Sequence, residues 1–301
     1  MGHDHHHRGA DYGRVFAIGI VLNFAFVFVE ATYGVFAHSL ALVADAGHNL
    51  SDVLGLGLAW GATILARTPP SERRTYGWGS SSIFAALLNA IMLLIAVGGI
   101  VWEALRRLHA PEAVGGQTMI GVAMIGLVIN TITAMMFFRG RHADLNLRAA
   151  FVHMAADAVV SAGVIVAGAA ILFTGWLWVD PVVSLLIAGA IVWGTWDLLT
   201  ESINLALHGV PARINLAEVR NYLSNLPHVT AVHDLHIWPT STTETALTAH
   251  LVRNVENCDC TLLAEAAAEL KTRFEIGHAT LQFEMVGHRC ELASPQEPCG
   301  V

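Results

Sequence analysis

The chain has few charged residues and almost no lysine. Only 13% of its 301 residues are charged, whereas an ordinary soluble domain has about 25%. Lys271 is the only lysine and no basic face is visible, so the sequence does not indicate a protein that binds nucleic acid. Hydrophobic residues make up 54% of the chain, and the mean hydropathy is +0.55. This composition predicts an α-helical membrane protein.

Cysteine is scarce as well, and all four copies lie near the C-terminus, at Cys258, Cys260, Cys290 and Cys299. If that region is cytosolic its thiols stay reduced, so they are candidate metal ligands or ordinary free cysteines rather than disulfide partners. A cleavable signal peptide is not expected, because the chain does not begin with a short basic segment. Residues 2–8 read Gly-His-Asp-His-His-His-Arg, a composition typical of metal binding, and an expression tag is the alternative.

Long apolar segments are abundant. Six of them are each long enough to cross about 30 Å of hydrocarbon as a helix rising about 1.5 Å per residue. They cover residues 14–36, 40–66, 80–105, 118–138, 147–173 and 180–199. An even number of crossings leaves both termini on one side, and most flanking arginines gather there, which predicts cytoplasmic termini. Arg106 and Arg107 break this pattern, and snorkelling at a helix end is the only explanation that the sequence offers.

After Pro211 the sequence changes to the pattern of a small α+β domain. We predict a helix at 216–226 opened by Asn215 as N-cap, strands at 229–238 and 245–252, a helix at 262–274 and a strand at 280–286. This order is typical of a ferredoxin-like unit. The expected organisation is a histidine-rich segment at 1–13, a six-helix transmembrane domain at 14–207, a cytosolic ferredoxin-like domain at 208–287 and a loose tail at 288–301.

Two polar pairs interrupt the apolar segments. His48 and Asp52 lie four residues apart, which places both on one face of a helix, and His153 and Asp157 repeat this spacing. A charge at the centre of a membrane helix costs at least a few kcal/mol, so these carboxylates are expected to face other helices, a cavity or an ion. Counted from the start of their helix, His48 and Asp52 lie roughly 12 to 18 Å deep, near mid-membrane.

Two imidazoles and two carboxylates form a ligand set that Zn²⁺ accepts in tetrahedral geometry. A site at that depth can be reached from either face only if helices move, as in alternating-access carriers. Because metal binds neutral imidazole and ionised carboxylate, protons compete for the same atoms, which predicts proton coupling. A proton relay without metal, or a structural cross-bridge between helices, is the alternative interpretation.

Further polar residues lie in the apolar segments. Glu30 and Asn130 are candidates for lining an ion path or for hydrogen bonding between helices. Asp45 lies three residues before His48, on a similar face, and is a candidate for orienting that imidazole. Asp180 precedes a proline, which predicts that it caps its own helix.

The chain resembles the cation diffusion facilitator family, close to its zinc-transporting bacterial members. The matching motifs extend over nearly the whole chain. They are Ser39-Leu40-Ala41-Leu42-Val43-Ala44-Asp45-Ala46-Gly47-His48 with Asp52, Tyr76-Gly77 followed by Ala85-Ala86-Leu87-Leu88-Asn89-Ala90, Val179-Asp180-Pro181, and His233-Asp234-Leu235-His236-Ile237-Trp238. The resemblance implies six membrane helices, a cytosolic metallochaperone-like domain, a homodimer, and export of Zn²⁺ in exchange for H⁺. It assigns the transport site to His48, Asp52, His153 and Asp157, and it implies a bacterial inner-membrane location.

The resemblance also implies a regulatory metal site in the cytosolic domain. Its expected ligands are His233, His250 and Glu284, with His278 nearby, as well as Cys290 or Cys299. Strand alternation points His250 and Glu284 away from the core but groups His233 with Leu235 and Ile237, where a core histidine is the natural interpretation. For His233 we follow the resemblance.

The leading hypothesis is a dimeric Zn²⁺/H⁺ antiporter in the lipid bilayer that exports zinc from the cytoplasm. A carrier of the same type for Co²⁺, Cd²⁺, Ni²⁺, Mn²⁺ or Fe²⁺ is the first alternative, because ligand sets overlap among these ions. A membrane metal sensor that does not transport is the second. An enzyme is not expected, since an intramembrane metalloprotease would need a motif such as His-Glu-x-x-His, which does not occur in the sequence.

Overall fold

The computed structural model describes residues 24–66, 68–138, 145–255 and 260–286. The chain forms two compact units, one of residues 1–57 and 89–196 and the other of residues 58–88 and 197–301, and each is treated by itself. The histidine tract at 2–8 and three of the cysteines, Cys258, Cys290 and Cys299, lie outside the described residues.

Each predicted apolar segment contains a helix. A helix at Phe24–Phe36 is followed by α2 (Leu40–Ala66), α3 (Ser81–His109), α4 (Gly116–Phe138), α5 (Leu145–Thr174) and α6 (Val179–Ala206). Four of them, α3, α4, α5 from Phe151 onward and α6, are long and apolar enough to cross a membrane. Among the described residues the helix Phe24–Phe36 is apolar but shorter, and α2 is not one of these four, so the number of six spans stays a prediction.

The outer surfaces of these helices are apolar. Large side chains such as Ile95, Trp102, Phe173 and Trp193 are exposed, with Phe173 at 89% and Trp193 at 85%. Monomeric soluble proteins rarely expose so many large apolar groups together. Such a surface is expected where acyl chains replace water as the solvent.

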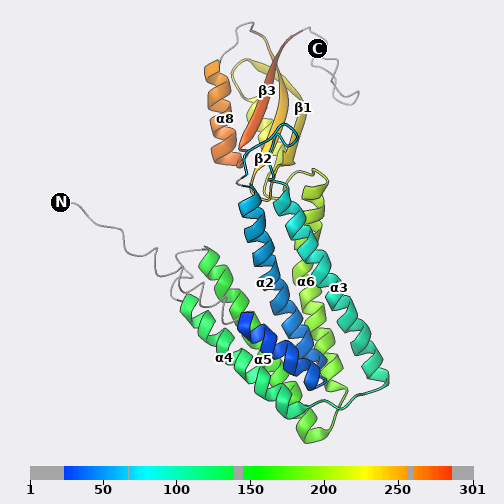
Figure 1. Ribbon diagram of the computed structural model, residues 1–301. Helices are drawn as coiled ribbons and strands as arrows, with labels where there is room; N and C mark the ends of the chain where they lie inside the picture. Colours follow the sequence, from blue (N-terminus) through cyan, green and yellow to red (C-terminus); the bar gives the residue numbers. More distant parts are fainter. Residues whose placement is uncertain (1–23, 67, 139–144, 256–259, 287–301) are drawn as a thin grey trace, which may run out of the picture. The chain divides into compact units, whose positions relative to one another are not determined.

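Helices α4 and α5 run side by side (Figure 1). They approach closely because glycines face each other across the contact. A Cβ atom on Gly116 would lie 2.9 Å from Cγ of Leu172, and one on Gly168 would lie 2.8 Å from Cγ1 of Ile120. Small residues allow membrane helices to gain van der Waals contact in the absence of a hydrophobic driving force. Larger residues at either glycine would force the two helices apart.

Asp180 caps a helix, but not its own. Its carboxylate accepts hydrogen bonds from Ser39 Oγ at 2.7 Å, Leu40 N at 2.8 Å and Ala41 N at 3.3 Å, which are groups at the start of α2. The prediction that Asp180 caps α6 is therefore wrong. The first amides of a helix have no partner within it, and an anion at that end also interacts favourably with the helix dipole. Asp180 thus joins the first turn of α6 to the first turn of α2.

Arg106 and Arg107, which the sequence left unexplained, form a second set of contacts at the end of α3. Arg107 donates to the backbone oxygen of His38 at 2.5 Å and pairs with Glu103 at 3.0 Å. Arg106 pairs with Glu103 at 2.7 Å and with Glu112 at 3.2 Å. The end of α3 is thereby bound to the connection before α2. Arg107 is therefore a structural residue, and snorkelling is not needed to explain its position.

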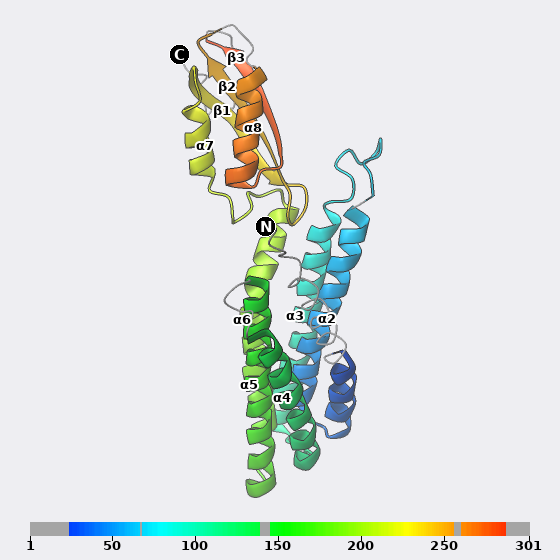
Figure 2. The same cartoon turned by 90° about the vertical axis from the view of Figure 1, so that its left-hand side faces the viewer.

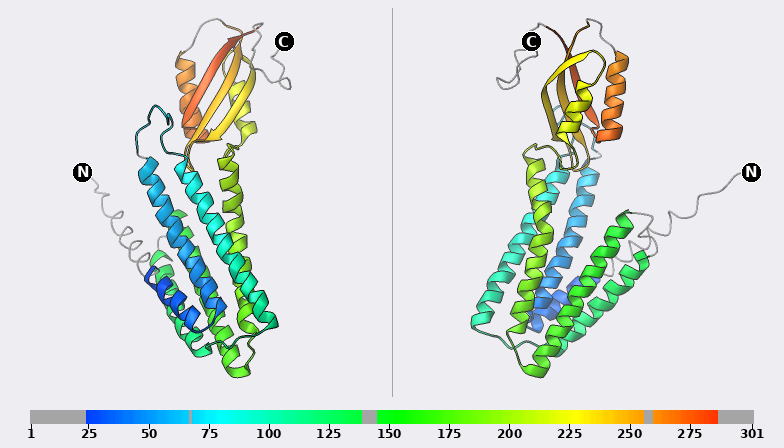
Figure 3. Two further views of the ribbon diagram at one scale, coloured as in Figure 1. Left: turned by 45° about the vertical axis from the view of Figure 1, so that its right-hand side comes forward. Right: turned by 180° about the vertical axis from the view of Figure 1, so that it is seen from behind.

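The C-terminal region is an α+β domain with the predicted order of elements. It comprises α7 (Leu216–Ser224), β1 (Val229–Pro239), β2 (Thr245–Arg253), α8 (Cys260–Phe274) and β3 (His278–Met285). The side chain of Asn215 accepts hydrogen bonds from Ala217 N and Glu218 N, which confirms the predicted N-cap. Helices α7 and α8 lie beside each other on one face of the sheet (Figures 2 and 3).

The three strands are ordered β1-β2-β3. Strand β1 pairs with β2 in antiparallel orientation, and β3 pairs directly with β2 in parallel orientation. In a split βαβ unit another strand lies between the two parallel strands. The sheet of the described residues therefore establishes an α+β domain but not the finer ferredoxin-like topology.

The turn between β1 and β2 contacts the residues that open α3. Ser80 Oγ donates to Thr240 O at 3.3 Å, and Thr242 N donates to Ser82 Oγ at 3.0 Å. A Cβ atom on Gly79 would lie 2.6 Å from Thr240 O, so only glycine permits this approach. The sheet is thus hydrogen-bonded to the start of α3.

Replacing Asp180 with alanine should destabilise the protein strongly. The substitution leaves three donors at the start of α2 without their acceptor, and hydrogen bonds to a buried charge make an expected loss of about 3 kcal/mol in the free energy of unfolding. Thermal unfolding in detergent measures the loss. Asp197→Ala, at an exposed acid on the same helix, is the matched control. Equal melting temperatures for the two variants would contradict the proposed cap.

Candidate metal sites

Helices α2 and α5 bring together the two predicted His/Asp pairs. His48 Nε2 lies 3.7 Å from Asp52 Oδ2 and 3.9 Å from Asp157 Oδ1. His153 Nε2 lies 3.2 Å from Asp52 Oδ2 and 3.7 Å from Asp157 Oδ2. Ligand atoms of His48, His153 and Asp157 all lie within 4.8 Å of one another, and the Asp52 carboxylate adjoins both imidazoles. We call these four residues the membrane cluster.

The acceptors of the membrane cluster lack ordinary partners. Asp157 Oδ2 and Asp52 Oδ2 are buried oxygens with no hydrogen bond of good geometry among the described residues. Buried polar atoms without partners are rare in folded proteins and call for an explanation such as an ion. The Asp157 side chain is 3% exposed, whereas that of His153 is 41% exposed. The cluster is thus accessible on the His153 side.

Local contacts hold the α2 half of the cluster in place. Ser51 Oγ donates to Asn89 Oδ1 on α3 at 3.5 Å. A Cβ atom on Gly55 would lie 2.9 Å from Asn89 Nδ2, so the lack of a side chain permits this close contact. Asp45 does not orient His48 as predicted, because His48 Nδ1 has no hydrogen-bond partner among the described residues.

A second cluster lies on the sheet of the C-terminal domain. Glu284 bridges two histidines, with Oε2 at 2.9 Å from His233 Nε2 and Oε1 at 2.8 Å from His250 Nδ1. His233 and His250 face each other across β1 and β2, and their ring centroids lie 5.1 Å apart. Ligand atoms of these three residues lie within 4.8 Å of one another. We call them the sheet cluster.

A β-bulge explains why alternation misplaces His233. It pairs with His250, whereas His236 pairs with Thr248, so β1 has one residue more than β2 between these pairs. The extra residue reverses the alternation of side chains. His233 consequently shares its face with His250 instead of with the core residues Leu235 and Ile237.

The bulge also introduces a residue that sequence reasoning missed. Asp234 has a φ of 50°, in the left-handed region, which aspartate tolerates better than most residues. One carboxylate oxygen lies 2.9 Å from His236 Nε2 and the other 3.5 Å from His250 Nε2. The only signal in the sequence was an acid between two histidines. Asp234 is therefore a further acidic group at the edge of the sheet cluster.

His278 does not join the sheet cluster. Its ring lies 5.6 Å from that of Tyr76, and both residues line a separate pocket of about 500 Å³. His278 begins β3, six residues before Glu284, and a strand rises about 3.3 Å per residue, so roughly 20 Å separates the two positions. His278 was predicted to lie near this cluster, but the length of β3 places it out of reach.

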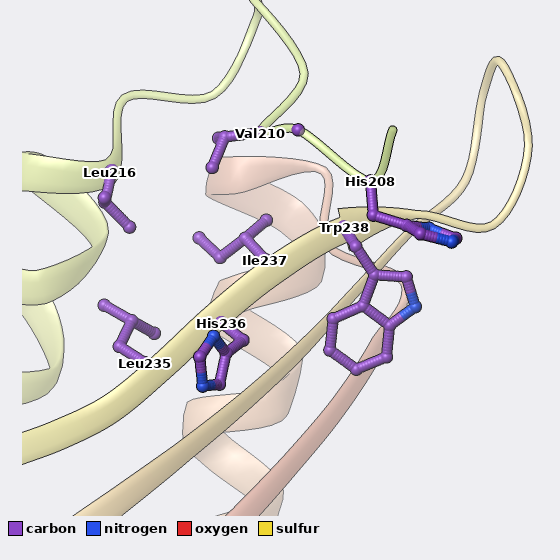
Figure 4. A pocket seen from close by; sticks show the side chains of 8 residues that line it. His208, Val210, Leu216, Leu235, His236, Ile237 and Trp238 are labelled. Atoms are coloured by element: carbon purple, nitrogen blue, oxygen red, sulfur yellow. The ribbon is translucent and has the colours of Figure 1, made fainter. Parts of the chain in front are cut away.

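A pocket of about 540 Å³ lies at the start of the C-terminal domain, and its lining includes His208 and Trp238 (Figure 4). Leu235 and Ile237 lie on one side of β1, and His236 and Trp238 lie on the other (Figure 4). The lining is mainly apolar, and neither His208 nor His236 belongs to a group of three or more potential metal ligands among the described residues.

Both parts of the chain match known families. Residues 16–205 match the family described as the cation efflux transmembrane domain, and residues 211–286 match the cytoplasmic domain of cation efflux proteins. The chain belongs to the cation efflux family. The resemblance to cation diffusion facilitators is thereby confirmed, and the four long apolar helices agree with a multi-pass membrane protein of the bacterial inner membrane.

Several bacterial relatives of this family align with almost the whole chain. Metal cation efflux system protein CzcD of Cupriavidus metallidurans is 37% identical over 97% of this chain and 92% of its own length. Zinc transporter ZitB of Escherichia coli is 34% identical over 94% and 93%. The cadmium, cobalt and zinc/H(+)-K(+) antiporter of Bacillus velezensis is 32% identical over 96% and 93%.

Among solved structures, the metal-bound C-terminal domain of the CzcD transporter is similar in sequence. It is 38% identical, covers 24% of this chain and 99% of that chain, and has a TM-score of 0.22.

The geometry of the two clusters predicts two classes of bound metal. Equilibrium dialysis with Zn²⁺ should give one ion for each cluster in the unmodified protein. Asp157→Asn keeps the size of the side chain but removes an anionic oxygen, so the ion of the membrane cluster should be lost. The affinity should fall by more than the ~10- to 100-fold typical of outer-shell changes. Asp197→Asn, an exposed acid on α6, should change nothing, and equal loss in both variants would contradict the assignment.

Proposed function

We propose that the chain is a Zn²⁺/H⁺ antiporter that exports zinc from the cytoplasm by alternating access. The membrane cluster carries this proposal: two histidines and two aspartates from α2 and α5 converge within ion-pair distance inside an apolar helical bundle. Acids in such a place cost free energy to bury, and they usually mark ion or proton pathways. Two imidazoles and two carboxylates also match the number and type of ligands that zinc prefers.

The same ligands supply proton coupling. Zinc binds His48 and His153 only as neutral imidazoles and Asp52 and Asp157 only as carboxylates, so loading of the ion releases protons. Protons that arrive from the other side compete for these atoms and displace the ion there. Metal and protons then occupy the site alternately, which is the requirement for exchange. The helices need only expose the cluster to one side at a time.

Zinc is the proposed main substrate, with cadmium and cobalt as the first alternatives. Relatives at 32% to 37% identity carry names that refer to metal cations, to zinc, or to cadmium, cobalt and zinc. Imidazole and carboxylate ligands suit several first-row ions, so ligand type alone does not select one. Ni²⁺, Mn²⁺ and Fe²⁺ remain members of the same class of substrate.

The finer architecture belongs to the same proposal. We infer six membrane spans in residues 14–207, which are the four long apolar helices together with α2 and the helix Phe24–Phe36, and we infer that both termini lie in the cytoplasm. The order α7-β1-β2-α8-β3 is the ferredoxin-like order without the strand that would precede α7. In the complete fold that first strand would lie between β2 and β3. Without it, β3 pairs directly with β2. We also propose that the cytosolic domain, residues 208–287, mediates a homodimer, as expected for its family.

Transport assays test the antiport directly. Protein in vesicles that contain a zinc-sensitive dye should move Zn²⁺ when a pH gradient is imposed. Asp52→Ala and Asp157→Ala should each abolish this flux, because each leaves the ion with fewer than four ligands. Asp197→Ala should transport normally. The same vesicles tested with Cd²⁺, Co²⁺, Ni²⁺, Mn²⁺ and Fe²⁺ rank the substrates, and unaltered zinc flux in both cluster variants would favour a membrane sensor over a carrier.

We further propose that the sheet cluster binds a regulatory zinc ion. His233, His250 and Glu284 supply two imidazoles and a carboxylate on the face of the sheet that the helices leave uncovered. The turn between β1 and β2 is hydrogen-bonded to the start of α3 through Ser80 and Ser82. A metal ion that stabilises the sheet would therefore act, through this turn, on the residues that begin α3. Regulation requires two states of different metal affinity, which a dimer that draws its cytosolic domains together would provide.

His250→Ala should weaken this regulation but leave the transport ligands intact. We expect the activating zinc concentration to rise at least about 10-fold, with an unchanged maximal rate, and the distance between spin labels on the two cytosolic domains to become independent of zinc. His278→Ala is the matched control, since it removes a histidine of the same domain outside the cluster. If His250→Ala and His278→Ala gave the same activation curve and the same distances, the regulatory role would be excluded.

A further inference from the structure

A pair of buried acids lies beside the membrane cluster without belonging to it. Glu30 on the helix Phe24–Phe36 is 0% exposed, and Asp45 on α2 is 2% exposed. The two side chains are within hydrogen-bonding reach of each other. Asn49 Nδ2 donates to Glu30 Oε2 at 3.2 Å. This bond does not satisfy the other oxygen of Glu30 or the Asp45 carboxyl group.

The pair lacks the partners that two carboxylates need. Glu30 Oε1 and Asp45 Oδ1 have no hydrogen-bond partner among the described residues, and no ion pair found in that part of the chain includes either acid. Two adjacent carboxyl groups do not both ionise in a low-dielectric environment, because each negative charge opposes the other. A single shared proton resolves both problems, since it removes one charge and supplies a donor between the two carboxyl groups.

The pair is placed where it responds to charge in the membrane cluster. Asp45 lies three residues before His48 on α2, and no direct hydrogen bond joins the two. Asp157 acts electrostatically on both acids of the pair, and His48 acts on Asp45. These are the titratable groups that face the pair from α2 and α5. The polar residues of α4 that are buried in this unit, Asn130 and Thr133, do not titrate. A divalent cation among these groups favours a second negative charge on the pair.

We propose that Glu30 and Asp45 form a proton-binding site, separate from the metal ligands, that releases its proton when metal binds and regains it when metal leaves. The proposal rests on the proposed antiport. In the release step the O–H bond of the shared carboxylic acid breaks, the electron pair stays on the carboxylate oxygen, and the proton passes to water. The pair thus adds a proton to those that the metal ligands exchange.

Calorimetry of zinc binding to the purified full chain tests this site. Titrations in two buffers with different ionisation enthalpies give the number of protons released per Zn²⁺, and His250→Ala in every protein reduces binding at the sheet cluster. Glu30→Gln and Asp45→Asn keep the size and hydrogen bonding of a protonated acid. Each should lower the number of released protons by about one and reduce the slope of the logarithm of zinc affinity against pH by about one.

The matched control is Glu103→Gln, the same chemical change at an acid that pairs with Arg106 and Arg107. It should release as many protons as the parent protein. An unchanged number in both folded pair variants, or an equal decrease in Glu103→Gln, would overturn the proposal. Should one pair variant fail to fold, the other decides, since each removes the shared site.

The outcomes also separate this proposal from the antiport itself. The antiport would be contradicted if the parent protein released no protons on binding zinc. It would also be contradicted if the His153→Ala variant bound zinc as tightly as the parent protein does. Normal release by the parent with no change in the pair variants would contradict only the pair. Replacing K⁺ with choline completes the test, because a zinc affinity that depends on K⁺ in the parent but not in Glu30→Gln would identify the pair as an alkali-cation site and overturn the proposal.

Discussion

The free-energy cost of ionisable side chains inside an apolar bundle constrains the rest of this structure. Helix α2 carries Asp45, His48 and Asp52 in a single two-turn segment, which an isolated membrane helix could not bury without partners. The chain supplies neighbours from two other helices: Glu30 of the helix Phe24–Phe36 lies beside Asp45, and the His153/Asp157 pair of α5 lies opposite His48 and Asp52. The membrane cluster thus joins α2 to α5, and the buried acids beside it join α2 to the helix Phe24–Phe36.

Outside the cluster, polar contacts fix the ends of the helices. Asp180 binds the first turn of α2, and Arg107 binds the backbone just before it, so the start of α2 is held from both α6 and α3. The contact between α4 and α5 relies instead on small residues near the ends of these helices, such as Gly116 and Gly168, that let the backbones approach. Because lipid offers no hydrophobic driving force between helices, polar contacts at helix ends and close packing of small residues are effective ways to hold membrane helices together.

The C-terminal domain separates its apolar core from its polar cluster by placing them on opposite faces of the sheet. Its helices cover one face of the sheet with apolar side chains, and the other face carries two histidines and a carboxylate. The bulge at Asp234 brings His233 onto that face, and the turn between β1 and β2 connects the sheet to α3. The sheet cluster and the hydrogen bonds to the start of α3 therefore both involve the hairpin of β1 and β2.

Periodicity and spacing in the sequence were sufficient for the helices, for most strand boundaries and for the pairing of His48 with Asp52 and of His153 with Asp157, because these are local properties of helices and strands. The motifs also sufficed for the family. The tertiary structure alone decided which helix Asp180 caps, what Arg107 binds, and that Glu30 meets Asp45, since each contact joins residues that are distant in sequence or depends on how helices rotate against each other. His233 and His278 show the same division within one domain: a bulge reversed the face of the first, and strand length separated the second from Glu284.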